Sequence, residues 1–351
     1  DGSEAREFPR LRHGGAHLVD PVMDWSRDIA VKAFRGLALA LLLWFVLAIV
    51  ISAVVARQAG SGVEAAWRMV WRGESATQWR AVLCALALVC VIVGPVMALA
   101  PHYHVLGTDK VGQDVLYQTL KSIRTGLVIG TLATLVMLPF ALVLGVMAGY
   151  FKGWIDDLIQ YFYTTLSSIP GVLLIAAAVL MMQVFIENHA DFFPTTEKRA
   201  DMRLIALCVI LGVTSWTGLC RLLRGEALKL REMEFIQAAH AFGVSHWRIM
   251  MRHIMPNVMH IVMIALVMDF SGLVLAEAVL SYVGVGVDPS MISFGTMINS
   301  ARMEMAREPM VWWSLAAAFV FMLTLVLAAN LFADAVRDAH DPRLHMAGER
   351  R

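Results

Sequence analysis

The chain alternates long apolar runs with short polar stretches. A bilayer core of about 30 Å requires roughly 20 apolar residues when it is crossed by a helix. Seven runs reach or approach that length: 36–56, 81–100, 126–149, 155–185, 204–223, 258–280 and 311–332. None shows the two-residue alternation of a membrane barrel strand. The pattern predicts an all-α polytopic membrane protein, because a helix satisfies its own backbone hydrogen bonds in lipid.

The run 155–185 is too long for one straight span, and Pro170 lies in its middle. Proline removes a backbone donor and disfavours the helical conformation of the preceding residue, here Ile169. We therefore expect a helix, a break near Pro170 and a second helical piece. A break at this depth either lines a cavity or is a plain packing kink.

The distribution of Lys and Arg predicts the orientation. The segment 221–252 is rich in both, and the tail carries Arg337, Arg343, Arg350 and Arg351, so both are expected on the cytoplasmic side. When the spans are counted back from the segment 221–252, the stretch 101–124 is expected to face outward. The turn 150–154 and the arginine-containing segment 57–80 are then expected to face inward.

The side of the N-terminus is left open by the sequence. Strict alternation of seven spans places it outside, whereas Lys32 and Arg35 beside the first run favour the inside. Either the run 36–56 spans the membrane, or it is interfacial or re-entrant.

Composition agrees with a membrane protein and narrows the classes of function. Hydrophobic residues make up 59% of the 351 residues and charged residues only 16%, which excludes an ordinary soluble enzyme, a disordered chain and a fibrous protein. Lys and Arg number 29 against 28 Asp and Glu, so no basic excess points to nucleic acid. The four cysteines lie in apolar runs and are expected to be reduced.

The cytoplasmic segment carries the most distinctive polar pattern. Good helix formers extend from Glu232 to Phe242. One face of the predicted helix consists of Phe235, Ala238, Ala239 and Phe242. Gly243 is suited to a left-handed cap that ends this helix. A second amphipathic piece is expected over 245–255, with Pro256 starting the next span. Such a helix lies on the lipid surface, docks on a partner or merely connects two spans.

One spacing in this segment resembles a known signature. Gln237-Ala238-Ala239, then Gly243, then Met255-Pro256 is similar to the EAA motif of binding-protein-dependent ABC importer permeases. Gln237, His253 and Met255 stand where that motif has Glu, Ile and Leu.

Further blocks resemble the dipeptide/oligopeptide/nickel subfamily of these permeases, as its second, C-type subunit. They are 104–115, 148–156, 277–287, 293–295 and 334–342. The resemblance implies a type I importer core of about five helices over 104–344, containing a coupling segment at 226–256. It leaves an N-terminal part, 1–103, with one or two extra membrane helices, and a cytoplasmic tail, 345–351.

The resemblance also implies partners and a function. Such permeases reside in the bacterial cytoplasmic (inner) membrane with a second permease, two cytoplasmic ATPases and an external binding protein, and they import peptides or similar small solutes. The coupling helix would dock on an ATPase through Gln237, Ala238, Ala239, Phe242 and Gly243, with Arg231 and Glu234 at the polar rim. Because the chain has no Gly-x-x-x-x-Gly-Lys-Ser/Thr loop, we expect no enzyme activity and no bound cofactor, with ATP hydrolysed by the partners.

Two acids lie in or near an apolar span, Asp269 and Glu277. Together with Pro170 they are candidates for a pathway or gate, and the alternative for each acid is a structural hydrogen bond. Membrane acids and broken helices also suit an ion-coupled secondary transporter, which is the alternative function. No metal site is expected, because Pro256 separates the histidines of this region.

Overall fold

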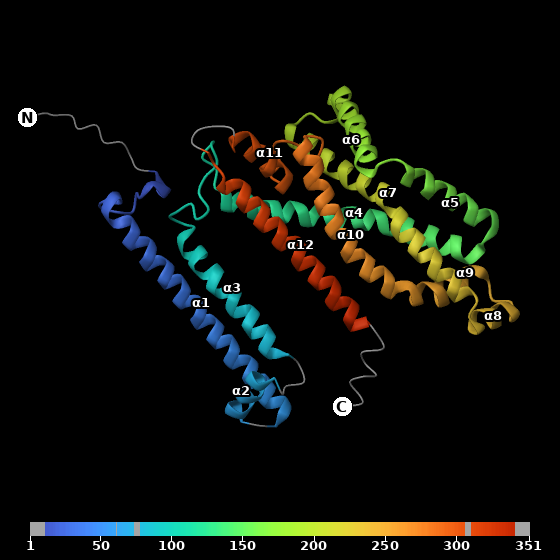
Figure 1. The fold of residues 1–351 in the computed structure, drawn as a ribbon, viewed down its shortest axis with the longest axis horizontal. Helices are drawn as coiled ribbons and strands as arrows, with labels where there is room; N and C mark the ends of the chain where they lie inside the picture. The colour runs from blue at the N-terminus through green and yellow to red at the C-terminus, as the bar shows by residue number, and fades with distance from the viewer. Residues whose placement is uncertain (1–10, 61, 74–77, 306–309, 341–351) are drawn as a thin grey trace, which may run out of the picture. The chain divides into compact units, whose positions relative to one another are not determined.

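The computed structural model describes residues 11–60, 62–73, 78–305 and 310–340, and these are almost entirely helical (Figure 1). Within this part of the chain, seven helical segments are long and apolar enough to cross a membrane. They coincide with the seven predicted apolar runs, so the all-α polytopic fold is confirmed. The predicted tail 345–351, with Arg350 and Arg351, lies outside the described residues, as does Arg343.

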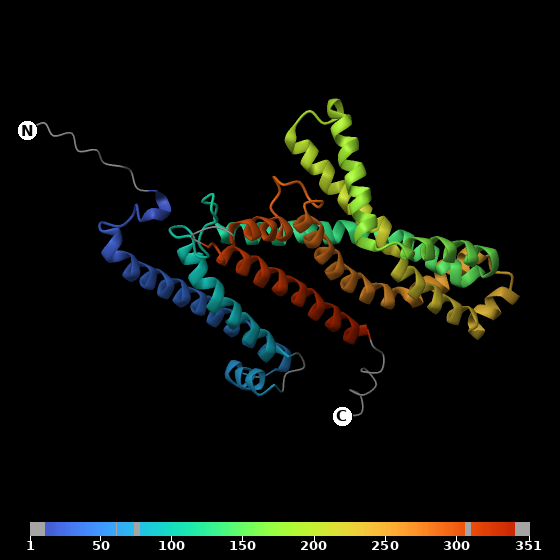
Figure 2. The same cartoon turned by 45° about the horizontal axis from the view of Figure 1, so that its top comes forward.

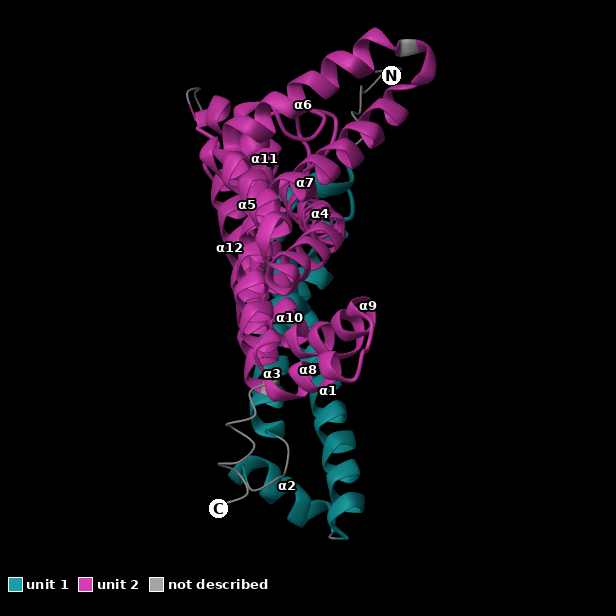
Figure 3. Cartoon of the chain, turned by 90° about the vertical axis from the view of Figure 1, so that its right-hand side faces the viewer, with its two compact units in different colours: residues 1–107 teal, residues 108–351 magenta. Residues whose placement is uncertain are grey.

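The chain divides into two compact units, residues 1–107 and 108–351 (Figure 3). Two of the seven candidate spans belong to the first unit and five to the second. The first unit contains α1 (Pro21–Ala59), α2 (Val63–Arg72) and α3 (Trp79–Leu99), with a 3₁₀ turn at Arg12–Gly14.

Unit 1 is a helical hairpin with a short helix at its turn. α1 packs against α3, and the indole Nε1 of Trp44 donates to the carbonyl of Leu83 at 2.9 Å. α2 was not predicted; it buries Ala66 and Val70 against the hairpin. Arg72, at its end, stays exposed. The turn between the first two spans is therefore an amphipathic helix rather than a plain loop.

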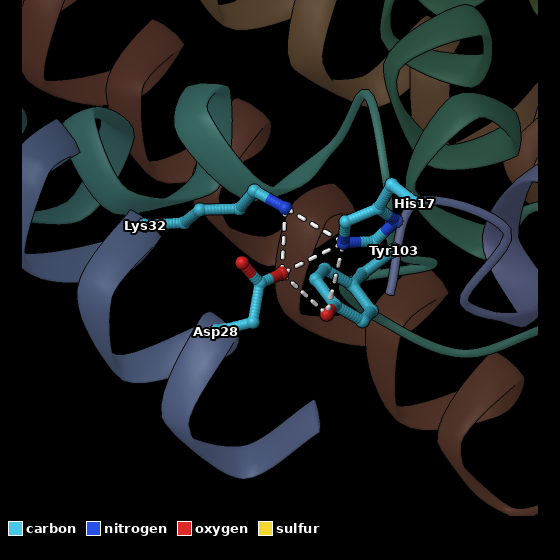
Figure 4. Close-up of polar contacts among 4 residues, drawn as sticks. All are labelled: His17, Asp28, Lys32 and Tyr103. Atoms are coloured by element: carbon cyan, nitrogen blue, oxygen red, sulfur yellow. Dashed lines mark hydrogen bonds and ion pairs between the residues drawn. The ribbon is translucent and has the colours of Figure 1, made fainter. Parts of the chain in front are cut away.

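A polar cluster joins the other end of this hairpin (Figure 4). The Asp28 carboxylate lies 2.5 Å from the Lys32 Nζ, 2.7 Å from the Tyr103 hydroxyl that donates to it, and 2.8 Å from the His17 Nε2. Burial and the hydrogen bond to Asp28 raise the pKa of Tyr103 to about 12. The hydroxyl therefore remains a donor across the physiological range, and the start of α1 is tied to the end of α3.

These contacts bear on the side of the N-terminus. α1 is one unbroken helix of 39 residues, about 58 Å long, whereas a re-entrant segment needs an internal turn. His17 and Asp28 lie at the same end of the hairpin as Tyr103, which is in the stretch predicted to face outward. If the stretch 101–124 faces outward, as predicted, the end of α1 that carries His17 and Asp28 faces outward too.

Unit 2 holds the remaining elements. They are α4 (Val115–Phe151), α5 (Gly153–Ser168), α6 (Gly171–Asn188), a 3₁₀ turn (Ala190–Phe192), α7 (Thr196–Arg231), α8 (Glu234–Ala241), α9 (His246–Ile249), a π-helical stretch (Met250–Ile254), α10 (Met255–Val283), α11 (Phe294–Met305) and α12 (Trp313–His340). An isolated antiparallel bridge pairs Thr108 with Asp114.

The long apolar run 155–185 breaks where the sequence predicts. α5 ends at Ser168, Ile169 is extended with φ −91° and ψ 133°, and Pro170 caps α6. In Figure 2 the two helices diverge from this point. Proline thus converts one apolar run into two helices of different direction.

α4 and α7 are the long axis of unit 2, with 37 and 36 residues. A Cβ added to Gly149 would lie 2.5 Å from the carbonyl oxygen of Arg224 and 2.6 Å from the Cβ of Ala227. The helix backbones can approach this closely only because position 149 has no side chain. Beside this contact, Arg224 forms a two-pronged ion pair with Asp156 at 2.6 and 2.7 Å, which ties α5 to α7.

The opposite end of unit 2 gathers the segments predicted to face outward. The Thr125 hydroxyl donates to the carbonyl of Ile292 at 2.8 Å, and Arg203 pairs with Asp288 at 2.9 Å. Burial raises the pKa of Asp288, but hydrogen bonds from Ser290 and the charge of Arg203 outweigh burial and lower it overall. The structure therefore groups the loops in the way that alternating spans require.

Pro256 lies in the first turn of α10, as expected, but α9, the π-helical stretch and α10 follow one another without a break from His246 to Val283. The turn before it is π-helical, and the Met255 N–H donates to the carbonyl of Met250, five residues back. A wider turn accommodates the missing proline N–H and the bulk of its ring without breaking the helix.

Candidate functional site

The predicted coupling helix exists and ends as expected. α8 spans Glu234–Ala241 and follows Met233, whose backbone is extended. Gly243 adopts φ +72°. Its N–H donates to the carbonyl of His240 at 2.9 Å, and the Val244 N–H donates to that of Ala239 at 3.1 Å. This pair of bonds is a Schellman motif, and it confirms the predicted left-handed cap.

α8 has one buried side and one uncovered side. Ile236 is fully buried in the core cluster that includes the end of α4 and the middle of α7. Ala239 is half-buried against the same cluster, while Ala238 is exposed. Phe235 is 45% exposed and Phe242 87% exposed. The face predicted from the sequence is therefore split, with Ala239 toward the core and the other three residues uncovered by this chain.

Tyr150, near the end of α4, holds α8 and α9 in place. Its hydroxyl lies 2.9 Å from the Nε2 of His240 and 2.8 Å from the Nδ1 of His246. The Tyr150 and His240 rings are stacked, with centroids 5.7 Å apart. No sequence pattern pointed to a partner for these histidines. The only available signal was that Tyr150 lies in one of the blocks that resemble the permease subfamily.

Charged contacts add to this anchorage. The Lys152 Nζ lies 2.8 Å from the Glu232 carboxylate, and the Arg231 guanidinium donates to the carbonyl of Tyr150 at 2.9 Å. The hydrogen bond from Lys152 lowers the pKa of Glu232. Gln237 donates to the carbonyl of Glu232 at 3.2 Å. Arg231 is thus engaged inside the chain, while Glu234 is exposed in the first turn of α8.

The two membrane acids lie in different surroundings. Glu277 is only 1% exposed, and the Ser281 hydroxyl donates to it at 2.6 Å. The same hydroxyl accepts the N–H of Val287 at 3.1 Å, so Glu277 supports the loop that follows α10. This geometry matches the structural interpretation of Glu277.

Asp269 lies eight residues before Glu277, about 12 Å along the helix, and it lines a cavity of about 340 Å³. Pro170 is exposed in the link between α5 and α6. The structure therefore does not bring the three predicted pathway residues together.

Among the described residues, no group of three or more His, Cys, Asp or Glu side chains is placed so that it could hold a metal ion. The four cysteines are free thiols.

Comparison with known proteins identifies the chain's family. Residues 141–346 match the family described as "Binding-protein-dependent transport system inner membrane component". The oligopeptide transport system permease protein OppC of Mycobacterium tuberculosis is 34% identical over 68% of this chain and 76% of the relative. The glutathione transport system permease protein GsiD of Pectobacterium atrosepticum is 32% identical over 69% and 73%.

Two further similarities extend the comparison. The dipeptide transport system permease protein DppC of Bacillus subtilis is 26% identical and covers 83% of this chain and 88% of the relative. Among solved structures, a chain of the MetNI methionine ABC transporter in an inward-facing conformation has a TM-score of 0.49 and 17% identity. It covers 66% of this chain and 99% of that chain.

The family match begins within α4 and extends through α12. None of these observations favours the ion-coupled alternative. A permease of this family works with other components of an ABC importer. The chain belongs to the binding-protein-dependent transport system inner membrane component family and is a multi-pass permease subunit of an ABC importer.

Proposed function

We propose that this chain pairs with a second permease and forms half of a path for peptides or a similar small solute. Two cytoplasmic ATPases and an external binding protein complete the assembly. The relatives named for oligopeptide, glutathione and dipeptide transport support the substrate class. Membrane lipid surrounds the apolar spans.

The proposal that an ATPase binds α8 rests on the exposed face of this helix. Ala238 allows close approach of another surface, and the aromatic rings of Phe235 and Phe242 flank it without being covered by this chain. Exposed aromatic residues around a small residue are typical anchors of a docking surface. Gln237 and Glu234, both exposed, provide polar neighbours.

The anchored side of α8 explains how docking would drive transport. Ile236 and the Tyr150 contacts tie α8 to α4, and the helix that begins at His246 continues into α10. A displacement of α8 by an ATPase would therefore move α4 and α10 rather than bend a loose loop. ATP itself would be bound and hydrolysed by the partner subunits, because this chain has no phosphate-binding loop.

The substitution Gly243→Asp tests this assignment. A side chain at φ +72° is strained, and a carboxylate adds charge beside the docking face. We expect ATP-driven uptake by the complete transporter to be abolished, with normal permease levels in the membrane.

The matched control is Gly73→Asp, which places the same substitution at a left-handed glycine, φ 76°, in unit 1. This control should transport normally. Unchanged uptake by Gly243→Asp at equal permease levels would contradict the coupling assignment.

A further inference from the structure

Asp269 is a carboxylate at the middle of a membrane helix. It lies 14 residues from each end of Met255–Val283, about 21 Å along the axis in both directions. Its side chain is half-exposed, and among the described residues none donates a hydrogen bond to it or pairs with its charge. An unpaired carboxylate at this depth costs about 2.5–3.5 kcal/mol on insertion scales. Compensation must therefore come from outside the described residues, and water or a ligand can supply it.

Asp269 lies in a groove that leads toward the cytoplasmic segment. Its cavity shares Gly218 and Leu222 with a neighbouring cavity of about 410 Å³, which extends along α7 to Lys229. Gly218 and Lys229 are 11 residues apart, about 16 Å along the helix. A Cβ added to Gly218 or Gly225 would meet nothing within 4 Å, so the floor of the groove is open.

A basic residue lines the same cavity as Asp269. Arg337, on α12, is exposed there. The Ser271 hydroxyl donates to Asn330 at 2.9 Å and fixes the register of the two antiparallel helices. From this register, Arg337 lies about 7–8 Å nearer the cytoplasmic end than Asp269 along the axis. Two extended peptide residues span about 7 Å, so the spacing matches the two charged ends of a dipeptide.

We propose that this groove is the inner half of the translocation path formed by this subunit, and that Asp269 binds the primary ammonium group of the transported peptide. Arg337 then faces the peptide carboxylate. The ammonium ion compensates the charge of Asp269 during passage, and no covalent bond is made or broken. This inference rests on the proposed function as a peptide permease.

Thiol labelling tests the access and the charge of the groove. The reporter is Ala265→Cys, one turn from Asp269, in a variant with Cys84→Ser and Cys90→Ser so that only buried Cys208 and Cys220 remain. The assembled transporter in inside-out vesicles is treated with a cationic trimethylammonium or an anionic sulfonate methanethiosulfonate reagent.

When each rate is divided by that of the same reagent with a small free thiol, we expect the cationic reagent to be favoured about tenfold over the anionic one, and Asp269→Asn to remove this excess. Ala-Ala should slow labelling. A reporter that stays unlabelled, as it would if it faced lipid or a second permease, overturns the proposal. So does a preference that Asp269→Asn leaves unchanged.

Uptake of Ala-Ala by the reconstituted transporter gives the second test. We expect Asp269→Asn to lower uptake at least about tenfold below saturation, while Asp269→Glu stays within about threefold of wild type. ATP hydrolysis stimulated by the binding protein should persist in both variants. The matched control is Asp157→Asn, at an exposed carboxylate on α5 outside the groove, and it should transport normally.

The outcomes separate this inference from the proposed function. Normal uptake by Asp269→Asn in a transporter whose wild type is active overturns the inference alone. If the second permease is lost from purified Asp269→Asn preparations, the carboxylate belongs to an interface between subunits. This result also overturns the inference. Absence of ATP-driven uptake by the wild-type assembly contradicts the proposed function itself.

Discussion

Replacing Tyr150 with Phe tests whether α8 is rigidly attached to the transmembrane helices. The substitution removes the hydroxyl that contacts both His240 and His246 and leaves the ring in place. Each of these two hydrogen bonds contributes about 0.5–1.5 kcal/mol. Both histidines are exposed, so water can replace part of each bond. We expect a net loss of about 1–2 kcal/mol, which is a factor of about 5–30 in the equilibrium between attached and detached α8.

Amide hydrogen exchange measures this equilibrium directly, because local opening controls the protection of the α8 amides. In the purified transporter, Tyr150→Phe should lower protection over residues 234–241 by about 5–30-fold and reduce the solute transported per ATP. Tyr161→Phe, at an exposed tyrosine of α5, is the control and should change neither. Unchanged protection in Tyr150→Phe would refute the argument that this hydroxyl anchors the helix.

Three further substitutions test the packing and the outer loops. Gly149→Leu should separate α4 from α7 and cost about 1–3 kcal/mol or more, seen as a lower Tm in detergent; an unchanged Tm would show that the helices can part freely. Because the folded pKa of Asp288 is lowered, its stabilising contribution is present above the ordinary aspartate pKa of about 4 and is lost as pH falls through the lower folded value. Arg203→Met should remove part of this acid-dependent fall in Tm, and an identical pH profile would contradict the pairing. Glu277→Gln should preserve the bond with Ser281, whereas Glu277→Leu should speed proteolysis of the loop at 284–293; equal cleavage of both variants would exclude the supporting role.

The features predicted correctly from the sequence depend on local chemistry. Each apolar run is long enough to specify a helix by itself, and the break at Pro170 follows from one missing donor and one restricted neighbour. The cap at Gly243 likewise follows from the freedom of a single residue.

The features that the sequence did not reveal depend on distant residues or on compensation. Tyr150 meets His240 and His246 across 90 and 96 residues, so no spacing rule connects them. Pro256 correctly signals the first turn of α10, but no sequence pattern showed that a π-helical turn would join α10 to the helix before it. The predicted pathway residues separate because Glu277 points into the core while Asp269 lines an open groove.

Site-specific photo-crosslinking can detect the proposed contact between the exposed face of α8 and a cytoplasmic ATPase. A photoreactive residue at position 242 replaces a side chain that is 87% exposed, and one at Phe192, 75% exposed at the outer end, is the matched control. In the complete transporter, we expect a crosslink to the ATPase from position 242 and none from position 192. A properly assembled, transport-active complex with no ATPase crosslink from position 242 would contradict it.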